Sequence, residues 1–247
     1  MLWFQGWDQA PPIVRACRAT WEARNPGWTV RALSAVDLHR YVPLDVLAPC
    51  IGGKHIEPEA LSDIFRIALL ERHGGVWVDS TLYCLQPLDE WLPAVTGSGF
   101  FAFARPKPDR MVASWFLAGA RGNPIVQAWY RQVLDYWQHR SHRHHYFWFH
   151  YLFAQCHDSD PLFREQWRRT PERLAEGPHY YVPYTGLDAP LSARDYQLLE
   201  GGATPLLKLT HKLPQAHYPD DSILGHLINR ALAHPHREAV PAAPTSG

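Results

Sequence analysis

The sequence predicts an α/β protein in which a mostly parallel sheet is flanked by helices. Three observations support this fold class. Strand-like and helix-like segments alternate near the start of the chain, and residues 61–79 read as a helix, a glycine break and an apolar strand. The length of 247 residues, with 46% hydrophobic content, is enough for a sizeable core. Such alternation is typical of a sheet with helical crossovers.

The N-terminal part contains two predicted strand–helix units. LWFQGW at 2–7 is the first strand, and IVRACRATWEARN at 13–25 is the first helix. A proline pair precedes this helix and a Pro-Gly pair follows it, as expected at helix ends. WTVRAL at 28–33 is the second strand, followed by a polar helix start at 34–37.

The next unit joins a helix to a strand through glycine. Pro58 suits the first helical turn, and Gly74 suits the C-terminal cap. An apolar strand follows and ends on Asp79. Apolar residues of the helix recur at spacings of three and four, which predicts one buried stripe. The stripe consists of Leu61, Ile64, Phe65, Ala68 and Leu69.

Four more elements are predicted further along the chain. They are a strand at 98–105, an aromatic helical region at 124–157, a strand at 206–212 and a helix at 222–232. We expect a single domain over residues 1–235. The low-complexity stretch 236–247 is expected to be a disordered tail.

Composition excludes several classes of protein. Lys plus Arg and Asp plus Glu number 24 each, so no global basic field attracts nucleic acid. The four cysteines form no CxxC pair, which indicates reduced thiols rather than a zinc ribbon or a disulfide scaffold. No secretory leader and no run of about 18 apolar residues occurs. We expect a cytoplasmic protein, and association with the inner face of the membrane stays open.

Charged residues of the 61–79 unit are the strongest functional signal. Asp63 and Arg66 are neighbours on the helix surface at spacing i, i+3, and an intrahelical ion pair would be worth only a few tenths of a kcal/mol. Asp79 at the end of the following strand brings a second carboxylate to the same neighbourhood. Carboxylate oxygens bind divalent cations, and a guanidinium fork binds phosphate oxygens. The combination predicts a site for a phosphorylated ligand.

One segment of the chain resembles a region of a known enzyme family. It covers residues 62–88, SDIFRIALLERHGGVWVDSTLYCLQPL. They are similar to the sugar-binding, Asp-x-Asp-containing region of glycosyltransferase family 32 and its bacterial capsular polysaccharide synthesis branch. The opening WFQGWDQAPPIVRACRATWEARNPGWTV at 3–30 also looks like the start of that family. The resemblance covers most of residues 2–232.

The resemblance implies a GT-A-like, Rossmann-related fold and a retaining hexosyltransferase. The donor would be a nucleoside-diphosphate sugar, with a UDP-sugar favoured. The acceptor would be a hydroxyl of a glycan or lipid-linked glycan in capsule, lipopolysaccharide or other surface polysaccharide synthesis. One alternative is a catalytically impaired nucleotide-sugar-binding subunit. Another, a metal-dependent phosphoesterase, would need more clustered carboxylates than the sequence offers.

The resemblance also assigns roles to individual residues. Asp63 and Arg66 would contact the donor sugar and its phosphates. Asp79 would be the first position of the Asp-x-Asp motif and would bind the ribose or a metal. Trp3 and Gln5 would lie beside the nucleotide base.

Relatives of the resembled family read Asp-x-Asp or Asp-Ala-Thr here, and this chain departs from the Asp-x-Asp pattern at the third position. This chain has Thr81 there, and a hydroxyl is a weaker ligand than a carboxylate for the expected Mn²⁺ or Mg²⁺. In the predicted strand at 206–212, alternation places Lys208 and Lys212 on one face and His211 on the other. His211 could complete the metal site with the motif carboxylate, or a lysine could neutralise the diphosphate. A solvated basic strand end is the remaining alternative.

The histidine-rich stretch 139–150 reads as a solvated turn between helices rather than a zinc site, because it lacks any Cys or HExxH partner pattern. His150, within an aromatic stripe, is either a packing residue or a residue of the acceptor cleft.

Overall fold

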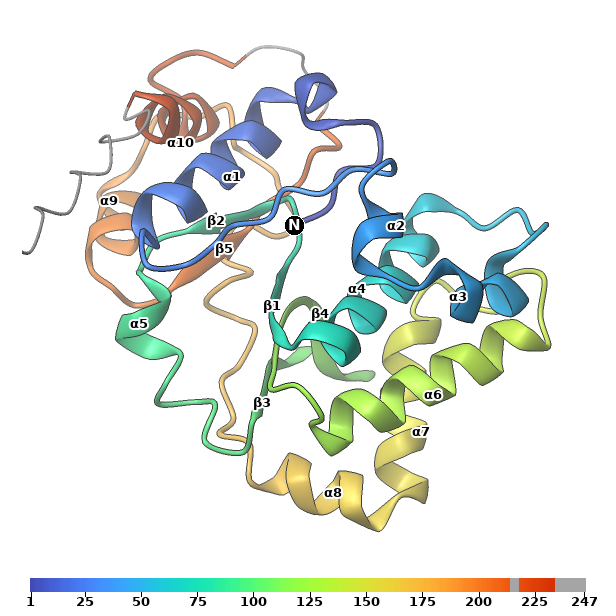
Figure 1. Ribbon diagram of the computed structural model, residues 1–247. Coiled ribbons are helices and arrows are strands. Elements are labelled where there is room, and N and C mark those ends of the chain that lie inside the picture. The colour runs from blue at the N-terminus through green and yellow to red at the C-terminus, as the bar shows by residue number, and fades with distance from the viewer. Residues whose placement is uncertain (214–217, 234–247) are drawn as a thin grey trace, which may run out of the picture.

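The computed structural model describes residues 1–213 and 218–233, where helices surround two small antiparallel sheets (Figure 1). The larger sheet has the order β1-β4-β3, with β1 at Gly75–Val78, β4 at Arg110–Gly119 and β3 at Phe100–Lys107. The smaller sheet pairs β2, Leu82–Cys84, with β5, Leu206–Lys208. An α/β fold class is confirmed.

The expectation of a mostly parallel sheet is wrong for the described strands, because every ladder between them is antiparallel. The predicted strands at 2–7 and 28–33 meet only as one parallel bridge, Leu2 to Leu33. Their contact is short because Gly6, with φ of 91°, turns the chain into the 3-10 turn Trp7–Gln9. The predicted tail at 236–247 lies outside the described residues.

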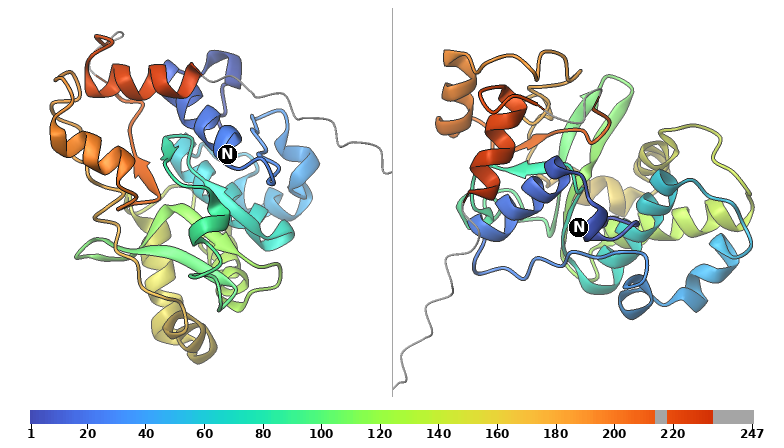
Figure 2. Two further views of the ribbon diagram at one scale, coloured as in Figure 1. Left: turned by 90° about the vertical axis from the view of Figure 1, so that its left-hand side faces the viewer. Right: turned by 90° about the horizontal axis from the view of Figure 1, so that it is seen from above.

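Two groups of helices pack on different sheets, and Figures 1 and 2 show them on separate sides of the molecule. Beside β1, β4 and β3 lie α2 (Leu38–Tyr41), α3 (Leu44–Ile51), α4 (Pro58–His73), α6 (Pro124–Gln138), α7 (Trp148–Ser159) and α8 (Pro161–Arg168). Beside β2 and β5 lie α1 (Pro12–Arg24), α9 (Ala193–Glu200) and α10 (Ile223–Leu232), with the short α5 (Leu88–Trp91) after β2. Each group encloses its own apolar cluster.

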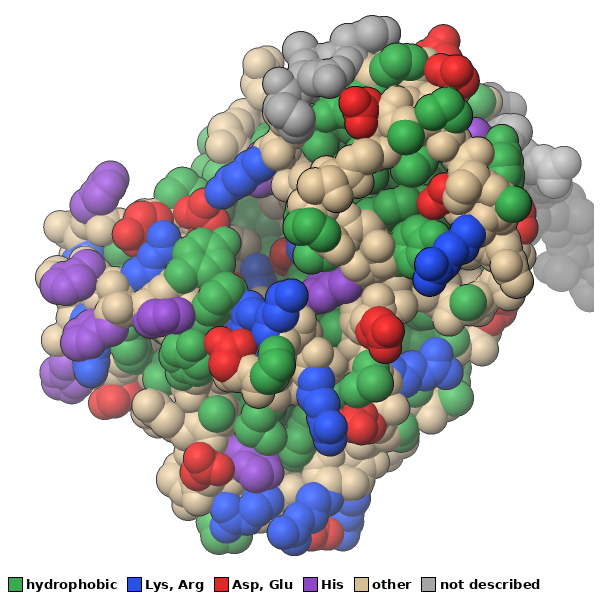
Figure 3. Space-filling model, turned by 180° about the vertical axis from the view of Figure 1, so that it is seen from behind, with side chains coloured by type: hydrophobic (Ala, Val, Ile, Leu, Met, Phe, Trp, Pro, Cys, Tyr) green, Lys and Arg blue, Asp and Glu red, His purple; other side chains and the backbone are tan. Residues whose placement is uncertain are grey.

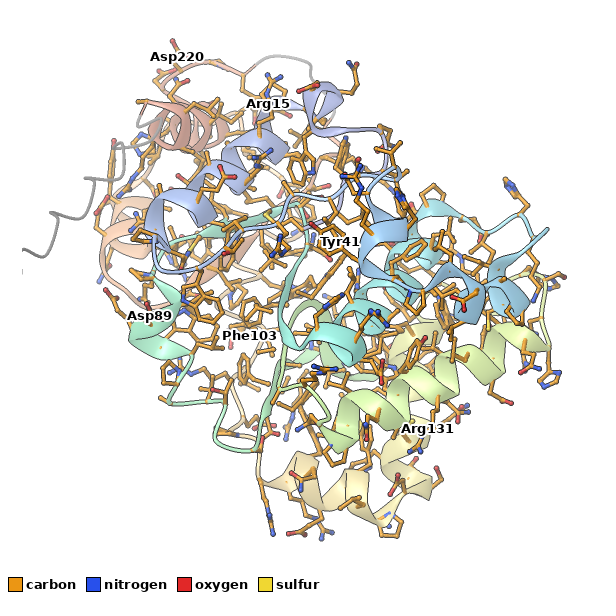
Figure 4. All side chains as sticks on the ribbon, viewed as in Figure 1. Arg15, Tyr41, Asp89, Phe103, Arg131 and Asp220 are labelled. Atoms are coloured by element: carbon orange, nitrogen blue, oxygen red, sulfur yellow. The ribbon has the colours of Figure 1, made fainter. Side chains whose placement is uncertain are left out.

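A third apolar cluster, rich in aromatic residues, joins the two groups. Trp91 contacts Phe101, Phe103 and Phe116, with ring centroids 5.3 to 6.0 Å apart. Figure 4 shows Phe103 in the interior and Arg131 of α6 at the periphery. Core packing therefore uses many of the aromatic residues, as the composition suggested.

Strand β4, the centre of the larger sheet, was not predicted from the sequence. Its apolar run follows a turn at Pro108 and Asp109, which is a hairpin signal between two apolar segments. The predicted helical region 124–157 is divided in two by residues 139–147, which form no helix.

Helix ends agree with their local sequence signals. Asn123 caps α6, accepting a hydrogen bond from the Ile125 N–H, and Ser222 caps α10, accepting one from the Gly225 N–H. The four cysteines are buried and free. Among the described residues the longest helix, α4, has 16 residues, and none is both long and apolar enough to cross a membrane.

Candidate active site

The α4–β1 unit gathers three charged side chains, as predicted. Arg66 Nη1 lies 2.9 Å from Asp63 Oδ1, and Arg66 Nη2 lies 3.1 Å from Asp79 Oδ1. Gly74 makes this possible because its φ of 67° ends α4 and reverses the chain directly into β1. One guanidinium therefore bridges a carboxylate of the helix and a carboxylate that follows the strand.

Arg66 is held firmly in place. It is 5% exposed, and Nη1 also donates to the Ser114 carbonyl on β4 at 2.9 Å. The Trp77 ring lies 5.2 Å from the guanidinium, and Trp77 Nε1 donates to Asp79 Oδ1 at 2.9 Å. Trp77 was not predicted as a site residue from the sequence. It precedes Asp79 by two residues, so the two side chains face the same side of the strand. The guanidinium therefore holds both carboxylates in position.

Burial dominates the electrostatics of Asp63. It raises the pKa of this carboxyl from 3.8 to about 7, although the Arg66 guanidinium lowers that pKa. The negative charge of Asp79 adds to the rise. A carboxyl with such a pKa exchanges its proton near neutral pH.

Lys208 lies directly beside the Asp79-Ser80-Thr81 motif. In the β2–β5 ladder Leu82 pairs with Lys208, and the Leu209 N–H donates to the Thr81 carbonyl at 2.9 Å. The Lys208 ammonium consequently donates to Thr81 Oγ1 at 2.5 Å. The third motif position is therefore occupied by a hydroxyl that contacts a cation.

These residues line a cleft of about 660 Å³, within the size range of small-molecule sites. Figure 3 shows a hollow on this side of the molecule with Lys and Arg side chains around it. The lining contains six basic side chains against three acidic ones. The basic residues are Arg66, Lys107, Arg110, Arg143, Lys208 and Lys212, and the acidic ones are Glu59, Asp63 and Asp79. A chain with no net charge thus has a locally basic cleft.

All nine site residues predicted from the sequence line this one cleft. They are Trp3, Gln5, Asp63, Arg66, Asp79, Thr81, Lys208, His211 and Lys212. Their positions agree with a shared site, and their individual roles stay predictions.

The N-terminal and C-terminal segments meet at one end of the cleft. The Trp3 and His211 rings pack edge to face at 5.2 Å. Trp3 Nε1 is buried without a hydrogen-bond partner among the described residues. Gln5 and Lys212 are exposed, and Lys212 Nζ lies 3.4 Å from Glu59 Oε1. Trp3 thus lines the cleft with its indole N–H buried and unpaired among the described residues.

Other residues that line the cleft were not predicted as site residues from the sequence. The Arg110 guanidinium lies 3.7 Å from the centroid of the Phe147 ring. Trp115 Nε1 donates to His179 Nε2 at 3.1 Å. No local pattern predicts these residues, because a hairpin, a helix entry and a distant loop bring them together.

His150 lines the cleft and also packs against the rings of Phe147 and Phe149, so both of its sequence-based interpretations stay open. Burial, with the positive charges of Arg66 and Arg110, lowers its pKa to about 3. Nδ1 is buried and unpartnered among the described residues. The imidazole of His150 is therefore neutral near pH 7.

The donor set does not fit the expected divalent cation. Asp79 offers a cation one oxygen, Oδ2, because Oδ1 accepts from Arg66 and Trp77, and the ammonium of Lys208 contacts the hydroxyl of Thr81. His211 packs on Trp3, and no three His, Cys, Asp or Glu side chains of residues 1–213 and 218–233 are grouped to hold a metal ion. Hard cations prefer several oxygen ligands with negative charge.

The fold and the cleft together define an α/β protein whose paired carboxylates and basic side chains suit a phosphorylated ligand. Residues 1–227 match the family described as "Capsular polysaccharide synthesis protein", and the chain belongs to this family. The sequence-based resemblance to capsular polysaccharide synthesis proteins is confirmed.

Two curated fungal relatives are similar over part of the chain. "O-glycosyltransferase braB" of Annulohypoxylon truncatum is 26% identical over 154 residues, covering 55% of this chain and 36% of that protein. "Glycosyltransferase afumC" of Aspergillus fumigatus is 24% identical over 154 residues, covering 55% and 39%. The alignments span less than half the length of these relatives.

Among solved structures, "PaToxG Glycosyltransferase" superposes with a TM-score of 0.47 at 13% identity, over 83% of this chain and 86% of that one.

Proposed function

We propose that this protein is a glycosyltransferase of surface polysaccharide synthesis. It would move a hexose from a nucleoside-diphosphate sugar to a hydroxyl of a glycan or lipid-linked glycan in capsule, lipopolysaccharide or related synthesis. The observation that carries the proposal is the Asp63–Arg66–Asp79 network in a basic cleft of a chain from the capsular polysaccharide synthesis family. The names of the two fungal relatives support the same reaction class.

The donor is proposed to lie along the cleft from Trp3 to Asp79. Trp3 and Gln5 line this part of the cleft, and the exposed amide of Gln5 suits the polar edge of a base, with a UDP-sugar favoured. Asp79 Oδ2 receives no hydrogen bond from the described residues, so it can accept one from a ribose or hexose hydroxyl. The ammonium of Lys208 suits the diphosphate.

The reaction breaks the bond between the hexose anomeric carbon and the diphosphate oxygen and forms a bond to the acceptor oxygen. Negative charge develops on the leaving diphosphate, and fixed cations stabilise it in the transition state. For retention we favour front-side attack, in which the acceptor proton passes to the departing phosphate oxygen. A covalent intermediate on Asp63 or Asp79, both of which pair with Arg66, is the alternative route to retention.

The alternative is a nucleotide-sugar-binding subunit without catalysis. The absence of a carboxylate at Thr81 is the observation that favours it. Nucleotide binding without transfer, over a panel of glycan acceptors, would support this alternative.

The central test is donor turnover by Asp79→Ala. We expect donor-dependent transfer or donor hydrolysis to fall by at least about a hundredfold, because both a substrate contact and a partner of Arg66 are removed. Release of nucleoside diphosphate from UDP-, GDP- and ADP-sugars is the measurement. Asp45→Ala is the matched control, because Asp45 is exposed on α3 away from the cleft. Equal activity of the two variants would reject the proposed site.

A further inference from the structure

The position of Lys208 suggests how the donor diphosphate is neutralised. Residues 79–81 read Asp-Ser-Thr, so the hydroxyl of Thr81 stands where an Asp-x-Asp motif would have its second carboxylate. The ammonium of Lys208 contacts the Thr81 hydroxyl at 2.5 Å and the Leu209 carbonyl at 3.1 Å. A positive charge of the protein thus occupies the region where the motif would otherwise recruit a cation.

The backbone holds this lysine in register. β5 pairs with β2 over three residues, and Lys208 lies opposite Leu82, the residue after Thr81. The Lys208 N–H also donates to the Pro178 carbonyl at 2.8 Å. Because the strand is anchored on both sides, the ammonium stays beside the motif without depending on a mobile loop.

The local charge also opposes a divalent ion. Asp63 and Asp79 share the guanidinium of Arg66, and the ammonium of Lys208, at Thr81, adds a second cation near Asp79. A divalent cation at Asp79 would therefore face an ammonium instead of a second carboxylate, and like charges at close range repel.

We propose that Lys208 replaces the divalent cation, so that this protein binds its nucleoside-diphosphate donor without a metal. This inference rests on the proposed function, since it concerns the same donor. It adds that the ammonium contacts the donor diphosphate and that chelators leave donor binding intact.

Calorimetric titration of the full chain with UDP, GDP and ADP tests the inference. We expect the best of these ligands to bind with the same affinity, within about twofold, in EDTA and in MnCl2. Lys208→Ala should bind about ten- to a hundredfold more weakly in EDTA, the loss expected for a charge-assisted hydrogen bond. Lys208→Arg should retain most of the affinity, since it keeps the charge.

Lys54→Ala is the matched control, because Lys54 donates to the Trp137 carbonyl outside the cleft. It should bind the nucleotide as the wild type does. Circular dichroism should show that Lys208→Ala is folded. If that variant is unfolded, the titrations of the wild type in EDTA and in MnCl2 decide by themselves whether donor binding needs a metal.

A double variant, Thr81→Asp with Lys208→Ala, provides the converse test. It removes the ammonium and restores an Asp-x-Asp carboxylate pair, so nucleotide binding should now become at least about tenfold tighter in MnCl2 than in EDTA.

The outcomes separate the two proposals. Binding by the wild type that is lost in EDTA and restored by Mn²⁺ would overturn the lysine inference and leave the proposed function standing. No binding of any nucleoside diphosphate under either condition would reject both proposals. Affinity of Lys208→Ala equal to that of the wild type in EDTA would overturn the inference alone.

Discussion

Arg66 determines the charge balance of the cleft. Its buried guanidinium contacts Asp63, Asp79 and the Ser114 carbonyl at distances from 2.9 to 3.1 Å. Removing one partner of a buried ion network leaves an uncompensated charge, which destabilises the protein strongly even where the intact network contributes little. Both carboxylates pair directly with this guanidinium, so Arg66 is a structural requirement of the site as well as a candidate functional residue.

Arg66→Met should lower the free energy of unfolding by about 3–5 kcal/mol, because both carboxylates lose their cation. Arg169→Met is the control, since its exposed pair with Glu165, at 3.2 Å, is worth at most about 1 kcal/mol. Urea denaturation measures both values. Adding Asp63→Asn to Arg66→Met should recover part of the loss. Similar losses in the two arginine variants would contradict a buried network.

At the scale of elements, the joint between α4 and β1 places Asp79. Gly74 has φ of 67° and ψ of −161°, a conformation that only glycine adopts readily. A Cβ at this position would lie 2.7 Å from the Arg121 nitrogen and 3.0 Å from the Gly119 carbonyl oxygen. The joint therefore needs glycine both for its backbone conformation and for the close approach of the end of β4.

Gly74→Ala should be clearly more destabilising than Gly53→Ala. Gly53 also has positive φ, at 69°, but a Cβ there meets nothing within 4 Å. Left-handed strain alone costs about 1–2 kcal/mol. The steric overlap at Gly74 adds about 1–3 kcal/mol. Thermal unfolding of both variants measures the difference, and equal midpoints would show that the joint is not tightly packed.

The β2–β5 pair is the second element that decides the site. It connects residues 127 positions apart, Thr81 and Lys208, through three paired positions. A short ladder of this kind is stable only within the apolar cluster of α1, α9 and α10 that covers it. The position of Lys208, the proposed donor-binding lysine, therefore depends on the packing of the C-terminal helices.

At the scale of the whole molecule, charge is distributed unevenly. The chain has no net charge, yet its cleft contains twice as many basic as acidic side chains. Asp63 is buried within this cleft, and its raised pKa couples the folding equilibrium of the whole chain to pH.

The sign of this coupling is definite. The pKa of Asp63 is about 7 in the folded state and 3.8 as an ordinary value, so between these pH values the folded state binds more protons. The contribution of Asp63 to stability is thus largest below about pH 4 and is lost as the pH rises to about 7. The free energy of unfolding of the wild type should fall relative to that of Asp63→Asn across this window. Urea denaturation at several pH values measures the difference, and a constant or rising difference would contradict the pKa assignment.

Much of the site could be predicted from the sequence because it is built locally. Helix, glycine and strand are consecutive from Pro58 to Asp79, so their periodicity and caps suffice to bring Asp63, Arg66 and Asp79 together. The chain's family could also be inferred from this block, and the match over residues 1–227 confirms it.

Strand direction and partners could not be predicted in the same way. Local patterns indicate that a segment is extended, but pairing depends on which distant segments share an apolar cluster. The missed strand β4 runs antiparallel between β1 and β3, and this order replaces the expected parallel sheet.

The sequence by itself determined the carboxylate–guanidinium network, because residues at helical spacing and across one glycine joint have little freedom to separate. Only the tertiary structure decided which other side chains lie beside that network. Strand pairing over a long separation places the Lys208 ammonium at Thr81. Loop and hairpin packing likewise brings Arg110 and His179 to the same cleft. No local periodicity encodes such contacts, since they form only when distant apolar segments are buried together.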